Sequence, residues 1–148
     1  MILLLDSGLI GPLCHSGKPQ SRPVSDWFWE TVATGRHEFC LPEIIDYELR
    51  RKLIHLTRIG RASQRSLDHL DRFGRLLTYL PLDTATMRHA AELWAEVRLR
   101  GLPTAPDTAL DVDVILAAQA VSVGGTVVTT NPRHLERFVP AKTWEELA

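Results

Sequence analysis

The sequence of 148 residues is long enough for one domain with a substantial core, and 45% of its residues are hydrophobic. With 24% charged residues and a formal net charge of −1, the chain is neither a disordered polymer nor a general polycation. Cys14 and Cys40 form no C-x-x-C pattern and favour a reducing compartment over a disulfide scaffold or a zinc site. The N-terminal apolar run is too short for a signal peptide or a membrane span. We therefore expect residues 1–148 to form a single cytoplasmic domain without membrane contact.

The first predicted element is a short strand that ends in polar residues. Residues 2–5 are aliphatic without alternation, which is typical of a central strand of a parallel sheet that is covered on both faces. Asp6, Ser7 and Gly8 follow at once. Ligands of open α/β sheets bind beyond the carboxyl ends of the strands, so Asp6 lies where a site is expected. It could also simply end the strand or cap the next helix.

Strands and helices then alternate along the chain. Residues 8–23 are rich in Gly and Pro and suggest a loop or a short interrupted helix, after which Ser25 is a plausible N-cap. We predict further strands at 38–41, 79–82, 127–129 and 141–144, and helices at about 25–34, 42–60, 62–77, 83–101, 112–123 and 132–138, with a loop at 104–110. This order predicts a three-layer α/β/α sandwich with a mainly parallel central sheet.

The helix predicted at 112–123 is almost wholly apolar, which indicates that it is buried. It nevertheless carries Asp113 in its first turn. The helix dipole favours a carboxylate there, but burial would be costly without a cation or hydrogen-bond donors. Asp111 would point elsewhere if it were helical. As a non-helical N-cap it could instead stand beside Asp113.

Two more polar side chains follow predicted strands. Glu48 could serve a site or only form an i,i+4 pair with Lys52. Asn131 follows the fourth strand and is also a good N-cap before Pro132. Carboxylates gathered at one sheet edge repel one another, and a divalent cation reverses the sign of that interaction. Oxygen ligands without a His or Cys cluster favour Mg²⁺ or Mn²⁺ over Zn²⁺ and suit phosphodiester hydrolysis.

Basic residues outnumber acidic ones between positions 50 and 75, where only Asp68 and Asp71 oppose them. The surplus could bind a polyanion, or it could be only the solvated side of two helices. The basic residues of this stretch are Arg50, Arg51, Lys52, Arg58, Arg61, Arg65, Arg72 and Arg75.

Four segments together resemble the PIN-domain ribonucleases, and most closely the VapC toxins of bacterial toxin–antitoxin pairs. They are Leu3–Ser7, Glu48–Arg50, Asp113–Ala120 and Val128–Leu135, in the order and spacing of that family, and the resemblance extends over the whole chain. It implies a PIN-like fold and an endoribonuclease that hydrolyses RNA with Mg²⁺ or Mn²⁺. It also implies a homodimer and a cognate antitoxin, as in a type II toxin–antitoxin system.

Carried over by position, Asp6, Glu48 and Asp113 match the acidic triad of the family and are the expected catalytic and metal-binding residues. Asn131 falls where many members place a further acid or an Asn, and we include it among the catalytic candidates. Ser7 matches the hydroxyl residue after the first Asp, and we group it with the candidate RNA contacts.

The sequence also departs from the family pattern. Gly8 replaces a common Asn and His134 a frequent Asp, so this site has fewer carboxylates than the richest members. Asp111 could compensate as an additional metal ligand. The basic stretch lies on the two predicted helices that follow Glu48, so we expect some of its side chains to flank the site, and we take Arg58, Arg61 and Arg65 as further candidate RNA contacts.

Two other hypotheses remain open at this point. The chain could be a catalytically weak or inactive PIN-fold module for RNA binding or protein interaction, although an inactive site has no physical reason to keep mutually repelling acids. It could also be an aspartyl phosphatase or phosphotransferase with Asp6 as the nucleophile. Those enzymes usually carry a second acid two residues later, where this chain has Gly8.

Overall fold

The computed structural model describes residues 1–15, 17–101 and 107–148. At its centre lies β1 (Ile2–Leu5), in which Leu3, Leu4 and Leu5 are 0% exposed. Burial of one such side chain contributes about 1.5–3 kcal/mol, so this strand is a large share of the core. The uninterrupted aliphatic run thus forms the doubly covered central strand that the sequence predicts.

In the described part of the chain, all the strands belong to one sheet with the order β3-β2-β1-β4-β5. Every adjacent pair is parallel, so the carboxyl ends of the strands meet at one edge. In the register, Leu4 lies between Cys40 and Val127. The other strands are β2 (Glu38–Pro42) and β4 (Thr126–Val128), which flank β1, and the edge strands β3 (Thr78–Leu80) and β5 (Ala141–Lys142).

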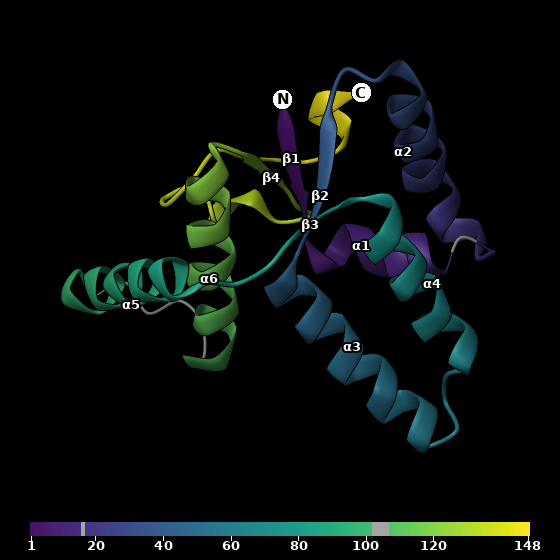
Figure 1. Ribbon diagram of the computed structural model, residues 1–148, viewed down its shortest axis with the longest axis horizontal. Coiled ribbons are helices and arrows are strands. Elements are labelled where there is room, and N and C mark those ends of the chain that lie inside the picture. The colour runs from purple at the N-terminus through teal and green to yellow at the C-terminus, as the bar shows by residue number, and fades with distance from the viewer. Residues whose placement is uncertain (16, 102–106) are drawn as a thin grey trace.

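Helices cover both faces of this sheet, which confirms the expected α/β/α sandwich. In Figure 1, α5 and α6 lie on one side of the sheet, and α1, α2 and α4 lie on the other. The α-helices are α1 (Ser7–Cys14), α2 (Arg22–Thr34), α3 (Glu43–Arg58), α4 (Gln64–Leu76), α5 (Thr84–Leu99) and α6 (Asp107–Val123). The short 3₁₀ helices are η1 (Pro19–Ser21), η2 (Pro132–His134) and η3 (Glu145–Leu147). Within the described residues, no helix combines the length and hydrophobicity needed to cross a bilayer.

Three predicted boundaries are wrong. The helix expected from Ser25 begins at Arg22, because η1 leads directly into it, and Ser25 is buried inside α2. The last predicted helix is only the short turn η2. The buried helix α6 starts at Asp107 and not near residue 112, while residues 104–106 of the predicted loop lie outside the described residues.

Gln119 of α6 fixes the two helices that carry the predicted acids. Its Oε1 accepts a hydrogen bond from the backbone N–H of Ile44 at 3.3 Å, and its Nε2 donates to the carbonyl of Leu80 at 2.8 Å. Gln119 is 2% exposed, so these bonds satisfy a side chain that would be costly to bury unpaired. The first bond ties α6 to the first turn of α3, one turn before Glu48, and the second ties α6 to the end of β3.

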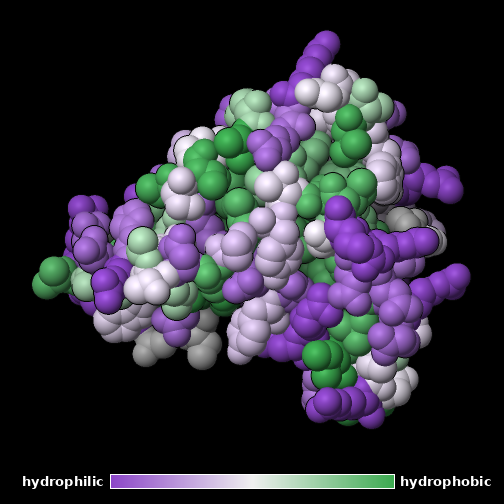
Figure 2. Space-filling model, in the orientation of Figure 1, coloured by the Kyte–Doolittle hydropathy of each residue, from purple (hydrophilic) through white to green (hydrophobic). Residues whose placement is uncertain are grey.

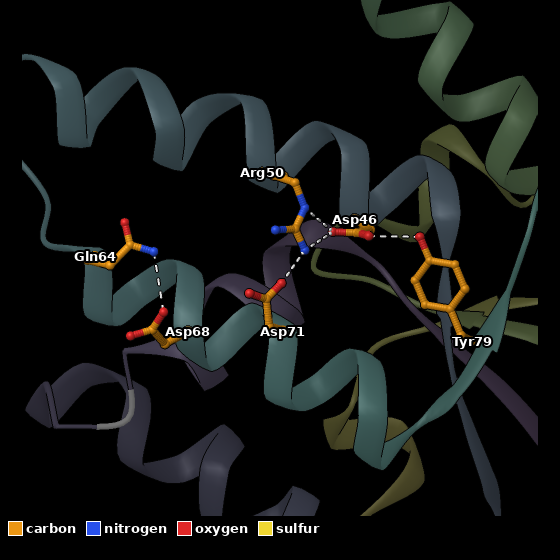
Figure 3. Close-up of polar contacts among 6 residues, drawn as sticks. All are labelled: Asp46, Arg50, Gln64, Asp68, Asp71 and Tyr79. Atoms are coloured by element: carbon orange, nitrogen blue, oxygen red, sulfur yellow. Dashed lines mark hydrogen bonds and ion pairs between the residues drawn. The ribbon is translucent and has the colours of Figure 1, made fainter.

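A second polar network braces α3 against α4 and the end of β3 (Figure 3). Arg50 donates from Nε to Asp46 at 3.0 Å and from its terminal nitrogen to Asp71 at 2.7 Å. The hydroxyl of Tyr79 donates to the other oxygen of Asp46 at 2.7 Å. Burial and the adjacent Asp46 raise the pKa of Tyr79, so its hydroxyl remains a donor at neutral pH. Arg50 therefore serves the fold.

The turn between α6 and β4 supplies a test of this packing. A Cβ on Gly125 would overlap the Cδ1 of Leu4 and lie 3.2 Å from the carbonyl oxygen of Ile2. We expect Gly125→Ala to lower the free energy of unfolding by about 1–3 kcal/mol, measured by urea denaturation.

Gly74→Ala is the matched control for that substitution. Its Cβ would meet only ordinary contacts, to Leu41 at 3.9 Å and to Tyr79 at 4.0 Å, inside helix α4. We expect a gain of about 0.5–1 kcal/mol from the lower entropy of the unfolded chain. Equal stability of Gly125→Ala and the wild type would contradict the tight approach of this turn to β1.

Candidate active site

Asp6 is held rigidly at the carboxyl end of β1. One carboxylate oxygen accepts a hydrogen bond from the backbone N–H of Ser7 at 2.7 Å, which makes Asp6 the N-cap of α1. The other oxygen accepts from the hydroxyl of Thr129, also at 2.7 Å. Asp6 also donates its backbone N–H to the carbonyl of Val128 at 3.0 Å, which continues the pairing of β1 with β4. The half-buried carboxylate thus has a fixed orientation at the edge of the sheet.

The segment after β4 lies against Asp6 and the start of α1. Thr129 is 2% exposed, and its hydroxyl oxygen accepts the backbone N–H of Asn131 at 3.2 Å. A Cβ on Gly8 would lie 2.9 Å from the hydroxyl oxygen of Thr130, so Thr130 fills the space that a side chain at position 8 would need. Asn131 is exposed at the N-cap position of η2, and its side chain makes no capping hydrogen bond there.

Asp113 lies inside α6, and its side chain is 23% exposed. Burial, the negative charge of Asp6 and, to a smaller extent, that of Glu48 raise its pKa from 3.8 to about 6. His134 and Arg137 act in the opposite direction. The Nδ1 atom of His134 lies 4.0 Å from an oxygen of Asp113. The cations near Asp113 therefore compensate its carboxylate only in part.

Glu48 lies half-buried in the second turn of α3. Its charge and that of Asp6 both act on Asp113, although 42 residues separate Asp6 from Glu48 and 65 separate Glu48 from Asp113 in the chain. The pair with Lys52 that would explain Glu48 without a site is not formed: no ion pair joins the two side chains in the part of the chain that the structure describes.

The donor set suits a hard divalent cation. Within residues 1–15, 17–101 and 107–148, no three His, Cys, Asp or Glu side chains already stand close enough to hold one ion together. Mg²⁺ does not need such a cage, because it usually keeps several waters and binds through one or two carboxylates. Asp6 and Asp113 offer only oxygen ligands, and burial together with the nearby charges of Asp6 and Glu48 makes the ionised form of Asp113 unfavourable and raises its pKa. A bound cation would stabilise that ionised form.

The structure does not bring Asp111 to these acids. Asp111 lies within α6, which begins at Asp107, so it is not the N-cap. Two helical positions correspond to about 200° of rotation, which turns Asp111 away from Asp113. It is exposed and borders a cavity of about 400 Å³ between α6 and α5, beside Met87 and Trp94.

The candidate RNA contacts lie at different distances from the acids. Ser7 is adjacent, although its hydroxyl is 3.5 Å from Asp6 and the strong bond comes from its backbone N–H. Arg58 ends α3, about 15 Å beyond Glu48 at a helical rise of 1.5 Å per residue. Arg61 is exposed in the turn after α3, and Arg65, at the start of α4, borders a cavity of about 380 Å³.

Three residues near the acids carry roles that sequence reasoning missed. Thr129 orients Asp6, while His134 and Arg137 lower the pKa of Asp113. The position of Thr129 directly after a strand next to β1 was a usable signal, because parallel neighbours end at the same edge. The family pattern marked position 134 as part of the site, but no spacing in the sequence indicated that His134, at the end of η2, and Arg137, after it, would act on Asp113.

A PIN-domain family model matches residues 3–139 of the chain. The fold is similar to that of VapBC from Salmonella typhimurium bound to DNA, with 25% identity, a TM-score of 0.69, and coverage of 97% of this chain and 98% of that one. It is also similar to VapBC-1 from nontypeable Haemophilus influenzae, at 16% identity, a TM-score of 0.72, and coverage of 98% and 99%. FitAcB from Neisseria gonorrhoeae gives 20% identity, a TM-score of 0.71, and coverage of 97% and 98%. No curated protein sequence matches the chain.

The raised pKa of Asp113 determines how the stability of the protein depends on pH. Above pH 6 the carboxylate is ionised in the folded state, where ionisation is unfavourable, and this lowers the free energy of unfolding. As the pH falls towards 4, proton uptake by the folded state removes that destabilisation. In metal-free buffer we therefore expect Asp113→Asn to raise the free energy of unfolding at pH 7.5 by at most about 3 kcal/mol, and by little near pH 4.

Asp26→Asn, on the exposed surface of α2, is the matched control and should change stability little at either pH. Urea denaturation of the three proteins at both pH values measures the difference. An Asp113→Asn variant that is no more stable than the wild type at pH 7.5 would show that Asp113 is not under electrostatic strain.

Proposed function

Because the chain belongs to the PIN-domain family, we propose that it is a divalent-metal-dependent endoribonuclease that hydrolyses RNA phosphodiester bonds. The observation that supports this proposal is the raised pKa of Asp113, which comes first from burial of its carboxylate and then from the negative charges of Asp6 and Glu48. These acids would hold Mg²⁺ or Mn²⁺, and Asn131 would act beside them.

The residues of the chain have separate tasks in this proposal. Asp6, fixed by Ser7 and Thr129, would present one oxygen face to the cation without reorganisation. Asp113 and Glu48 would approach from α6 and α3 by side-chain rotation. A divalent cation bound there supplies charge stabilisation of the phosphoryl group and acidifies a bound water. The Nδ1 atom of His134 lies 4.0 Å from an oxygen of Asp113 and would help to position that carboxylate.

We further propose that the chain is the toxin of a type II toxin–antitoxin pair, acting in the cytoplasm as a homodimer that a cognate antitoxin neutralises. The sequence resembles VapC toxins, and the similar structures include those described as VapBC from two bacteria. The low identities support the fold alone, so the partner is inferred from the resemblance. Arg58, Arg61 and Arg65 remain candidate phosphate contacts along the α3–α4 hairpin.

A catalytically weak or inactive PIN module is the second candidate. One observation favours it: among the described residues, no three potential ligands stand ready around a common point. Such a module would bind RNA or a protein without hydrolysis. Metal-dependent cleavage separates the two candidates.

Cleavage of a labelled single-stranded RNA in Mn²⁺ tests the nuclease proposal. Loss of a residue that only orients a metal ligand typically lowers activity about 10–100-fold. We therefore expect the cleavage rate to fall by that factor for Thr129→Ala and by a larger factor for Asp113→Asn. Asp113→Asn should keep or raise RNA affinity, because it removes a negative charge from the site. Asp26→Asn should cleave like the wild type. Cleavage that persists in EDTA, or that Asp113→Asn leaves intact, would contradict the proposed chemistry.

Thermal stability tests the cation site independently of catalysis. If the acids repel one another without a cation, millimolar Mn²⁺ should raise the melting temperature, because it binds the folded state. A free Mn²⁺ concentration of 100 times the Kd would raise the free energy of unfolding by about 2.7 kcal/mol. Asp6→Asn should reduce this gain and keep α1 intact, because Asn is as good an N-cap as Asp. KCl at equal ionic strength controls for screening. A wild-type melting temperature indifferent to Mn²⁺ would count against the site.

A further inference from the structure

Tyr47 is a large aromatic side chain left on the surface next to the candidate active site. It precedes Glu48 in α3 and is 56% exposed. The guanidinium carbon of Arg51, one turn later, lies 5.1 Å from the centre of the Tyr47 ring. The two side chains thus form a cation–π pair that faces solvent. Neither contributes to the buried core.

Arg51 also stands on the same helical face as Glu48. Helical residues three or four positions apart are neighbours on the surface, so Arg51 lies beside Glu48 as well as beside Tyr47. The cationic side chain of the pair therefore lies one turn beyond Glu48, on the side of α3 that leads away from the acids.

Three exposed cations of α3 are not neutralised. Arg51, Lys52 and Arg58 are exposed, and no carboxylate of the described residues forms an ion pair with them. Arg50, on the neighbouring face, contrasts with them, because Asp46 and Asp71 hold it (Figure 3). Figure 2 shows that hydrophilic residues cover much of the surface around α3. An anionic partner with a flat apolar group fits this combination of charge and ring.

We propose that Tyr47 and Arg51 form a stacking platform for one unpaired base of the RNA substrate, beside the phosphodiester that the candidate active site would hydrolyse. The proposal rests on the nuclease function proposed above and adds a substrate class to it. Bases stack on aromatic rings and guanidinium planes whatever their identity, while Lys52 and Arg58 would contact neighbouring phosphates. In an A-form duplex the bases are already stacked and cannot reach a protein ring, so the platform selects single strands and loops.

A second copy of the chain is a less suitable occupant of this face. In a two-fold contact residue i of one copy meets residue j of the other, so Arg51, Lys52 and Arg58 would each need an acidic partner on the same face. Asp46 and Asp71, two acids of α3 and α4, already hold Arg50. An extended polyanion meets the same side chains with charges of opposite sign.

RNA binding measured by fluorescence anisotropy tests the platform, in the Asp113→Asn background so that no RNA is cleaved. We expect Tyr47→Ala to raise the Kd for a single-stranded oligonucleotide about 5- to 150-fold, the usual range for one base stacked on an aromatic side chain. Tyr47→Phe keeps the ring and should stay within about twofold of the parent. Arg51→Ala should weaken binding and flatten its dependence on salt.

Trp29→Ala is the matched control, because Trp29 is also an exposed aromatic side chain, 47% exposed, but on α2. It should leave the Kd unchanged. Three results would overturn the platform: a Tyr47→Ala Kd equal to that of the parent, an equal loss for duplex and single-stranded RNA, or a change from dimer to monomer in light scattering. Failure of the wild type to cleave RNA that it binds would refute the nuclease function and leave the platform standing.

Discussion

Asp113 is held as a partly buried carboxylate near the negative charges of Asp6 and Glu48, and the proposed function depends on this unfavourable arrangement. Hydrogen bonds and core packing in the rest of the fold keep it in place. Asp6 cannot turn away, because Ser7 and Thr129 hold both of its carboxylate oxygens. Gln119 ties α6 to the start of α3, which keeps Asp113 and Glu48 at the same edge. The buried leucines of β1 stabilise the sheet that supports the arrangement.

Residue type and order along the chain were sufficient to predict the architecture and to select Asp6 and Asp113 as candidates, and Asp6 does act electrostatically on Asp113. A doubly buried strand followed by Asp6 and an apolar helix with Asp113 are visible without coordinates, since parallel strands end at one edge. Interactions between distant parts of the chain could not be predicted in this way. His134, at the end of η2, and Arg137, after it, act on Asp113, and the hydroxyl of Thr129 donates a hydrogen bond to Asp6 across 123 residues. The start of α6 was misplaced because apolar content, and not capping, set the predicted boundary, and this error left Asp111 with an N-cap role it does not have.

The basic stretch shows why a count of charges cannot assign a function. Arg50 braces α3 against α4, whereas Arg51, the next residue, faces solvent over Tyr47. One helical position, about 100° of rotation, separates a structural arginine from a candidate RNA contact. The net charge of −1 conceals this division, because the acids that cancel the arginines include the candidate metal ligands themselves. Only the face on which each side chain lies distinguishes the two uses.

Anomalous scattering from crystals grown with Mn²⁺ tests the central claim most directly, because it locates the cation without reference to activity. The account predicts a single strong peak, or a pair of peaks, at the carboxyl edge of the sheet, within about 2.0–2.3 Å of oxygens from Asp6 and Asp113. Glu48 should reach the same ion directly or through water. Absence of Mn²⁺ from this edge while other surface acids bind it, or a peak that Asp6 does not ligate, would contradict the account.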